Sequence, residues 1–191
     1  MSSLSWRQAA KDDRVLLQDF ACTEPQQKLQ NGRKAPHARP WEWGVQAWFR
    51  DRQSALADAA RYAKHGGRLL VATKDGHTGF AACVSLAHLT EPSIETPLRT
   101  QMGWDGPIWA LKALAVHSNL QRQGISCEVY EYVFQEILKE ENYSDTLVIA
   151  RIHPSNLASE KAAERAGFGL INDLPQPDEN RNWVSMLIDE A

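Results

Sequence analysis

The sequence predicts a mixed α/β domain, because strand-like and helix-like segments alternate through its second half. Residues 108–116 (IWALKALAV) and 146–152 (TLVIARI) are apolar on both faces of a strand, and a segment of helical periodicity follows each. Strands of this kind belong to a sheet that helices cover on both faces. The 191 residues are 43% hydrophobic and 24% charged, which fits one globular domain rather than a fibre or a disordered chain.

The first half of the chain predicts a strand, two helical regions and a hairpin. A short strand over 4–8 precedes a helix over 12–21. Residues 41–67 have helical spacing and end at a Gly-Gly pair, which is a typical helix stop. Two strand-like runs within 68–89 lie on either side of Asp75-Gly76, a pair that suits a tight turn.

The second half predicts one loop and the remaining elements of the alternating pattern. Residues 91–106 are expected to form the loop. A helix opens at Gly124, after the first buried strand, and a second helix begins near Asn156. Two short strands are expected near 169–172 and 183–188.

Composition and charge exclude several classes of function. The formal net charge of −3 argues against a protein that coats nucleic acid through bulk electrostatics. No apolar run approaches the roughly 20 residues that span a bilayer, and the polar N-terminus lacks a signal-peptide pattern. We therefore expect a soluble, cytoplasmic protein with no membrane partner. The cysteines are too widely spaced for a disulfide framework or a zinc site, so we expect buried thiols and no metal; they are Cys22, Cys83 and Cys127.

One segment departs from the acidic balance of the chain. Residues 23–40 contain four basic residues and three prolines, which predicts an extended basic loop. Within it, the stretch 24–40 could contact an acidic partner such as RNA. A solvated surface loop explains the same composition.

The segment that follows Val116 indicates an anion site. A polar turn follows the strand, and Gly124 allows the backbone to approach a ligand closely. The first-turn N–H groups of the next helix and the fixed charge of Arg122 would then bind a pyrophosphate. An ordinary strand–helix connection with a polar turn accounts for the same residues, so both interpretations stay open.

A second segment, 151–169, has the signals that begin and end a helix. Ser155 or Asn156 can cap its N-terminus, and Gly167 stands where a helix-terminating glycine belongs. Capping explains Asn156 completely. By itself, this segment indicates no chemistry.

Together the two segments resemble the GNAT superfamily of N-acetyltransferases. In that family a strand ends in Val, a Gln/Arg-x-x-Gly-x-Gly/Ala loop follows, and a helix begins. Here QRQGIS (121–126) begins five residues after Val116, with Gly124 at the matching position. The family also has a later Asn that is followed eleven and twelve residues on by Gly-Phe, and Asn156, Gly167 and Phe168 match this pattern.

The resemblance is clear from about 108 to 169, and it implies a fold, a co-substrate and a set of contacts. It implies one GNAT-like domain over 1–191, in which helices cover both faces of a mixed sheet with splayed strands. Acetyl-CoA would be the co-substrate. Residues 121–126 would hold its pyrophosphate, mainly through backbone amides, while the splayed strand and Asn156 would contact the pantetheine arm. The cofactor-binding residues implied in this way are Leu114, Ala115, Val116, Gln121, Arg122, Gln123, Gly124, Ile125, Ser126 and Asn156.

Two positions depart from the family pattern. The last small residue of the loop is Ser126 rather than Gly or Ala. Many relatives have a tyrosine seven residues after the Asn, where it protonates the leaving thiolate, and Ala163 stands there instead. Ser159 lies where some relatives have Ser, so the resemblance makes it the candidate catalytic residue for contacting or protonating the sulfur. A hydroxyl in the first turn of a helix is the alternative role.

The general base is not evident from the sequence. Relatives often place a carboxylate on the strand before the loop, whereas this strand offers Lys112. A lysine in so apolar a strand could be functional, paired with an acid or exposed at a splayed edge, and the last two interpretations are favoured. A water chain could replace a base, and His117 and His153 are expected to be structural. The loop carboxylates that could reach an acceptor are Glu42, Glu91 and Asp105.

The resemblance also places the acceptor pocket near a cluster of tryptophans. Trp41, Trp43 and Trp48 follow the basic loop, and their indole faces could receive a cationic amine. Trp41 and Trp43 are the predicted substrate-binding residues. Packing of helices onto the sheet is the alternative role for one or two of these rings.

The leading hypothesis is an acetyl-CoA-dependent N-acetyltransferase that moves the acetyl group directly to a primary amine of a small molecule, peptide or protein. A toxin-type acetyltransferase of aminoacyl-tRNA is a second hypothesis, which the basic loop motivates and Ala163 opposes. A non-catalytic acyl-CoA-binding module is a third, because the usual acid and the strand carboxylate are both absent. The acceptor, the base and whether the protein forms a homodimer are left open.

Overall fold

The computed structural model describes residues 4–22, 45, 48, 49, 55–142, 145–172, 174 and 180–187. Its strands are β1 (Ser5–Gln8), β2 (Arg68–Thr73), β3 (Ala82–His88), β4 (Ile108–Val116), β5 (Thr146–Ile152), β6 (Gly169–Ile171) and β7 (Arg181–Leu187). Its α-helices are α1 (Arg14–Asp19), α3 (Ala55–Arg61), α4 (Pro92–Met102), α5 (Ile125–Glu140) and α6 (Leu157–Arg165), and its 3-10 turns are η1 (Lys11–Asp13), η2 (Ala63–His65) and η3 (Ser118–Leu120). Within these ranges, no helix combines the length and the apolar character that crossing a membrane requires.

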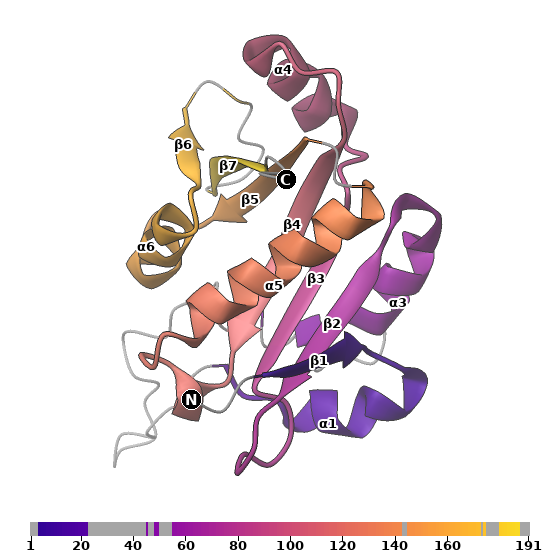
Figure 1. Cartoon of the computed structure of the whole chain (residues 1–191), viewed down its shortest axis with the longest axis vertical. Helices are drawn as coiled ribbons and strands as arrows, with labels where there is room; N and C mark the ends of the chain where they lie inside the picture. The colour runs from indigo at the N-terminus through magenta and orange to yellow at the C-terminus, as the bar shows by residue number, and fades with distance from the viewer. Residues whose placement is uncertain are drawn as a thin grey trace, which may run out of the picture.

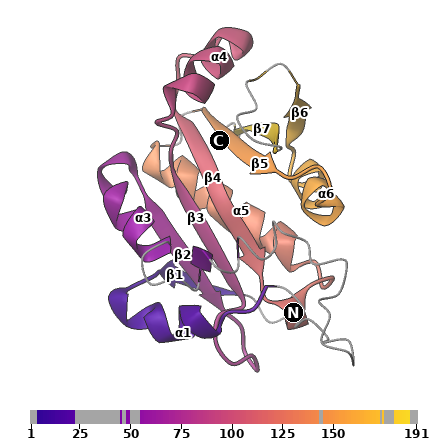
Figure 2. The ribbon, with the colours of Figure 1, turned by 180° about the vertical axis from the view of Figure 1, so that it is seen from behind.

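The seven strands form one mixed sheet in the order β1-β2-β3-β4-β5-β7-β6. β4 and β5 pair in parallel, and the other neighbouring strands pair antiparallel. Helix α5 crosses one face of the sheet, and α1 and α3 pack on the other (Figures 1 and 2). This arrangement confirms the predicted fold class.

β4 and β5 are apolar on both faces because each lies between two layers of the core. Trp109 and Val148 face α5, where Val133 packs with them. On the opposite face, Ile149 packs with Leu98 of α4. Every side chain named here is almost completely buried, which is why the two strands lack the polar alternation of half-exposed strands.

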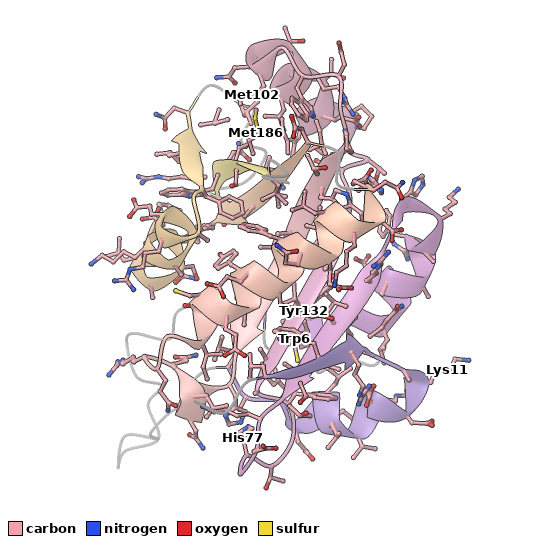
Figure 3. The ribbon with its side chains drawn as sticks, in the orientation of Figure 1. Trp6, Lys11, His77, Met102, Tyr132 and Met186 are labelled. Atoms are coloured by element: carbon pink, nitrogen blue, oxygen red, sulfur yellow. The ribbon has the colours of Figure 1, made fainter. Side chains whose placement is uncertain are left out.

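Two contacts fix the edge strand β1 to α5. The rings of Trp6 and Tyr132 stack with centroids 4.6 Å apart and planes 6° apart (Figure 3). Just before the strand, the backbone N–H of Leu4 donates to Oε1 of Glu128 (2.6 Å). The first turns of α5 are therefore held against the sheet from its outer edge.

The parallel pairing of β4 with β5 is short. Residues Ile108–Leu111 pair with Leu147–Ala150, although β4 continues to Val116 and β5 to Ile152. Beyond this pairing the two strands diverge, β4 toward the start of α5 and β5 toward α6 (Figure 1). The splayed strands that the family resemblance implies are therefore present.

β4 also contains a bulge next to the splay. Ser85 of β3 faces Ala113, and the following β3 residue, Leu86, faces Leu111, so that Lys112 is the extra residue in β4. A bulge of this kind changes the alternation of side chains along the strand. Leu111 packs in the layer under α5, whereas Ala113 packs in the layer under α1 and α3.

The segment predicted to be a loop over 91–106 contains helix α4, so this prediction was wrong. Pro92 begins the helix, where its missing N–H costs nothing. Ile94 and Leu98, one turn apart, are fully buried against the sheet. Pro97 lies inside the helix, and a proline in such a position usually indicates a helix end. Burial of the apolar face outweighs this local signal.

The hairpin of β2 and β3 forms, but its connection is longer than a tight turn. The backbone N–H of His77 donates to the carbonyl of Lys74 (3.0 Å), with Gly76 at φ 77°. The chain then continues until the N–H of Ala81 donates to the carbonyl of Ala72 (2.7 Å).

The three cysteines are free thiols, as expected, but only one is buried. Cys83 lies inside β3, Cys22 is half-buried, and Cys127 is exposed on α5. Burial raises the pKa of the Cys83 thiol well above its ordinary value, so this thiol stays protonated.

We predict that Gly66→Ala lowers the free energy of unfolding by about 2–4 kcal/mol. Gly66 ends η2 at φ 68°, and a Cβ there would lie 2.5 Å from Cη2 of Trp109, which is fully buried. Gly103→Ala is the matched control, because Gly103 ends α4 at φ 60° and has open space around a Cβ. The control should lose about 1 kcal/mol, the cost of the backbone conformation alone. Urea unfolding measures both variants, and equal losses would contradict the close packing of Gly66 on Trp109.

Candidate active site

The loop that follows β4 is held in place by its own side chains. Nε2 of Gln121 donates to the carbonyl oxygens of Val116 (3.0 Å) and Cys22 (2.7 Å). Nε2 of Gln123 donates to the carbonyl oxygen of Asn119 (3.1 Å). The Gln121 side chain therefore fixes the loop against the end of β4, and the Gln123 side chain fixes it internally.

Arg122 and Gly124 determine the shape of the same loop. Both have left-handed backbone conformations, with φ 63° and 79°, which glycine adopts without strain. Gly124 is the N-cap of α5, so the N–H groups of Ile125 and Ser126 have no intrahelical acceptor. A Cβ on Gly124 would meet no described atom within 4 Å. Within the described part of the chain, the space beside Gly124 is therefore open, and a helix start with an arginine next to it has the chemistry that suits a phosphate.

The splay exposes one edge of β4 beside this loop. Beyond Leu111 the edge of β4 that faces β5 has no strand partner among the described residues, while the other edge stays paired with β3 as far as Val116. The predicted contact residues Leu114, Ala115 and Val116 lead directly into the loop, and the Gln121 hydrogen bond joins the two. An extended ligand between β4 and β5 could hydrogen-bond to this edge.

Asn156 begins α6 on the other side of the splay. Its Oδ1 accepts a hydrogen bond from the backbone N–H of Ser159 (3.3 Å), which is the capping role that the sequence indicates. Its Nδ2 group makes no hydrogen bond to a described residue and is available as a donor. Ser159 is half-buried in the first turn. Contact of either side chain with a ligand stays a prediction.

Lys112 is paired with a carboxylate that the sequence reasoning missed. Its Nζ lies 2.9 Å from Oδ2 of Asp58 in α3 and 3.5 Å from the centre of the Tyr62 ring. Both favoured interpretations of Lys112 are confirmed, since it has an acid partner and lies where the splay begins. Asp58 and Tyr62 are one helical turn apart, but no local pattern links them to a strand residue 54 positions after Asp58.

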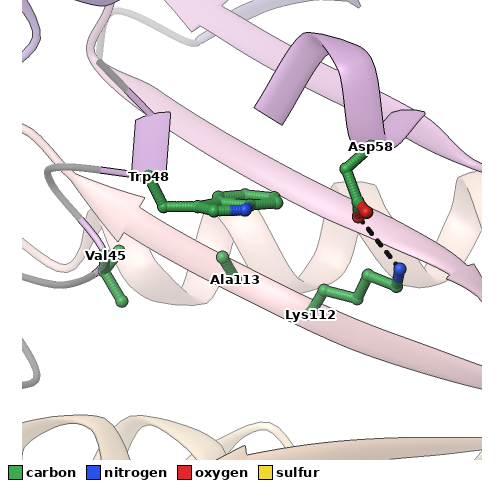
Figure 4. A pocket seen from close by; sticks show the side chains of 5 residues that line it. All are labelled: Val45, Trp48, Asp58, Lys112 and Ala113. Carbon is green, nitrogen blue, oxygen red and sulfur yellow. Dashed lines mark hydrogen bonds and ion pairs between the residues drawn. The ribbon is translucent and has the colours of Figure 1, made fainter. Parts of the chain in front are cut away.

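The Lys112–Asp58 pair borders an open pocket of about 380 Å³ (Figure 4). The lining residues are Val45, Trp48, Asp58, Lys112 and Ala113. Trp48 is the member of the tryptophan cluster that the structure describes. Trp41, Trp43 and Glu42 lie outside the described residues, as does the basic loop over 23–40.

The family model that matches this chain is "Acetyltransferase (GNAT) family", over residues 34–168. This chain belongs to the GNAT family. The match covers well over half of the chain and confirms the resemblance found in the sequence. A search of curated protein sequences finds no significant match.

Three solved structures illustrate how widely the GNAT fold is shared. The PaiA N-acetyltransferase from Thermoplasma acidophilum, in complex with coenzyme A, has a TM-score of 0.61 at 11% identity, over 97% of this chain and 99% of that one. AtaTR bound with AcCoA has a TM-score of 0.59 at 15% identity, over 95% and 92%. A bacterial toxin has a TM-score of 0.60 at 13% identity, over 97% and 92%. At such identities the likeness concerns the fold alone.

The Gly-Phe pair of the GNAT pattern has a structural role in this chain. Gly167 has φ 86°, and Phe168 is buried against Tyr130 and Phe134 of α5, with ring centroids 5.6 Å and 5.8 Å away. Burial raises the pKa of Tyr130 to about 12, so its phenol stays neutral in the core. Ala163, at the position of the family's tyrosine, is fully buried and supplies no acid.

The remaining sequence candidates fix turns or lie far from the loop. Nδ1 of His117 and Nδ1 of His153 each accept from the backbone N–H two residues later, at 3.3 Å and 3.2 Å. Each histidine thus stabilises the turn after a strand, as expected. Glu91 and Asp105 lie on either side of α4, near the start of β4 and so at the opposite end of that strand from Gly124 (Figure 1).

We predict that Asn156→Ala lowers the free energy of unfolding by about 1 kcal/mol, because α6 loses its N-cap acceptor. Asn156→Asp should have nearly wild-type stability, since aspartate caps helices as well as asparagine does. Denaturant unfolding of both variants measures the difference. Equal destabilisation by alanine and aspartate would contradict the capping role.

Proposed function

We propose that this protein is an acetyl-CoA-dependent N-acetyltransferase that moves the acetyl group directly to a primary amine of a small molecule, peptide or protein. The observation that carries the proposal is the free edge of β4, which leads straight into the open loop around Gly124 at the N-terminus of α5. A long thioester with a pyrophosphate at one end fits such an arrangement. GNAT structures that contain coenzyme A or AcCoA share the fold and support the same co-substrate.

The residues around the splay would divide the binding of acetyl-CoA among them. The backbone N–H groups of 124–126 and the Arg122 guanidinium would hold the pyrophosphate. The free edge of Leu114–Val116 would pair with the amides of the pantetheine arm. Nδ2 of Asn156 would donate to the same arm from the β5 side of the splay.

The reaction itself needs no covalent enzyme intermediate. The neutral amine nitrogen attacks the thioester carbonyl carbon, the C–S bond breaks, and the thiolate leaves with a proton. Ser159, in the first turn of α6, is the candidate donor of that proton or of a hydrogen bond to the sulfur. An alkylamine is protonated at neutral pH, with a pKa near 10.4 for a lysine-like amine, so a group in the acceptor pocket must also remove a proton.

We predict that Gly124→Glu raises the Kd of acetyl-CoA at least about 100-fold, equivalent to about 2.7 kcal/mol, because a carboxylate would face the pyrophosphate. Gly103→Glu is the matched control. Gly103 also has a positive φ and open space around a Cβ, but it ends α4, far from the loop. Calorimetric titration measures the Kd of acetyl-CoA for both variants. Unfolding in the presence of ligand is an independent measurement: at an acetyl-CoA concentration of about 100 Kd, the free energy of unfolding of the wild type should rise by about 2.7 kcal/mol. Absence of binding to wild type would overturn the proposal.

We predict that Asn156→Asp weakens acetyl-CoA binding by about 10-fold while leaving stability unchanged, because the amide donor becomes an acceptor. Calorimetry at neutral pH measures the loss. The variant keeps the helix cap, so weaker binding would reflect a contact with the ligand and not a damaged helix. Wild-type affinity in Asn156→Asp would remove this residue from the binding site.

Release of the CoA thiol on addition of amines distinguishes a transferase from a non-catalytic acyl-CoA-binding module. Transfer above background that is lost in Gly124→Glu supports the enzyme. Tight acetyl-CoA binding without transfer to any amine or peptide would favour the module. The cytoplasmic location and a homodimer remain predictions, as does RNA binding by the stretch 24–40.

A further inference from the structure

The pocket beside Lys112 lies on the opposite face of the sheet from the Gly124 loop. Helix α5, which the loop begins, packs on one face with Leu111. Ala113, which lines the pocket, packs on the other face with residues of α1 and α3. A ligand of this pocket would thus approach the splay from the side opposite to α5.

The pocket also reaches the point where the splay begins. Leu111 and Ala150 form the last pair between β4 and β5. Lys112 and Ala113 are the next two residues of β4, and the bulge allows both to line one pocket. If acetyl-CoA lies along the free edge of β4, a group in this pocket is adjacent to it.

The chemistry of the pocket is that of paired opposite charges beside aromatic surface. Lys112 Nζ contacts Asp58 Oδ2 at 2.9 Å and lies over the Tyr62 ring. Figure 4 shows the indole of Trp48 extending toward this ion pair. The two charged side chains are 27% and 22% exposed, so a ligand can reach both. An ammonium has three donors and a carboxylate has about four lone-pair sites, so each can take a second partner.

We propose that this pocket binds the acceptor, and that the acceptor is a small zwitterion: a primary amine that carries its own carboxylate beside an apolar or aromatic group. Asp58 would hold the acceptor's ammonium, Lys112 its carboxylate, and Trp48 its apolar part. The proposal rests on the proposed N-acetyltransferase function. A volume of about 380 Å³ is in the range of small-molecule sites.

The charge arrangement favours this class over a simple amine. A purely cationic amine that contacts Asp58 would also lie next to the Lys112 ammonium, and like charges at such a distance repel. An acceptor carboxylate on Lys112 offsets this repulsion and gives the ammonium a second partner beside Asp58. The pocket therefore selects for two opposite charges on one molecule.

The proton balance of the transfer assigns Asp58 a second role. The acceptor ammonium loses one proton to Asp58 and becomes a neutral amine, which attacks the acetyl carbonyl carbon. After the C–N bond forms, the nitrogen loses a second proton as the C–S bond breaks. One of the two protons ends on the CoA sulfur and the other passes through Asp58 to solvent. The products are the N-acetyl amino acid and the free CoA thiol.

The test compares amino acids with their decarboxylated amines as acceptors, for example phenylalanine with phenethylamine, at saturating acetyl-CoA. We expect kcat/KM for the amino acids to exceed that for the matched amines by at least about 10-fold. Lys112→Gln should reduce this preference to about threefold or less, because it raises KM for the amino acids. Lys112→Glu should reverse it in favour of the amines.

The control is Lys139→Gln, which removes an ion-paired lysine on α5 without touching the pocket. It should keep the wild-type preference. Asp58→Asn should lose transfer to amino acids and amines alike. Circular dichroism checks that each variant folds, and partly exposed ion pairs contribute little to stability.

A second readout does not depend on transfer. Binding of phenylalanine should broaden its NMR signals in the presence of wild-type protein but not of Lys112→Gln. A mixture of acetate and methylamine, which carries the same two charges on separate molecules, should not displace phenylalanine from the wild-type protein. Acetyl-CoA binding without acetylation of any amino acid, or an equal kcat/KM for amino acids and amines, would overturn this inference and leave the proposed function intact. Absence of acetyl-CoA binding would overturn both.

Discussion

The central constraint of this structure is that β4 and β5 stop pairing after Leu111 and Ala150. A parallel sheet normally leaves no backbone groups of an inner strand unpaired. Among the described residues, the last part of β4 has no strand partner on the β5 side, while its other side stays paired with β3. The same divergence sends β4 toward α5 and β5 toward α6, so the N-termini of both helices follow the two sides of one gap (Figure 1). An unpaired strand edge, the start of α5 at Gly124 and the start of α6 at Asn156 are thus consequences of one short strand pairing.

The bulge at Lys112 adds a second consequence at the same point. Without the extra residue, β4 would alternate regularly and present its side chains to the two layers in turn. With it, Lys112 and Ala113 both line the pocket on the α3 side, while Leu114 packs with the layer under α5. The loop around Gly124 leads into the helix on one face of the sheet, and the charged pocket lies on the other face, next to the point where β4 and β5 diverge. In the proposed direct transfer, acetyl-CoA and the acceptor would approach the splay from these two faces.

How far the sequence predicts this arrangement depends on the range of the interactions. The strands over 108–116 and 146–152 and the helix between them were predictable, because burial on both faces and helical spacing are local patterns. Helix α4 was not, because Pro97 hides a helix whose stability comes from burying Ile94 and Leu98. The splay followed only from the family resemblance, since no property of one strand indicates where its neighbour leaves it. The Lys112–Asp58 pair joins residues 54 positions apart across two elements and has no local signature.

The ion pair also bears on why the strand carries a lysine at all. The resemblance to the GNAT family leads to the expectation of a carboxylate on this strand. In this chain the carboxylate comes from α3 and the strand supplies the cation. The strand tolerates this lysine because its side chain is partly exposed where the splay begins and contacts Asp58 and the Tyr62 ring. Asp58 thus keeps a carboxylate beside the splay, and Lys112 adds a cation that would not interact favourably with a simple amine. If the pocket binds the acceptor as we propose, the charge that looked out of place in the sequence is the feature that most restricts which acceptors fit.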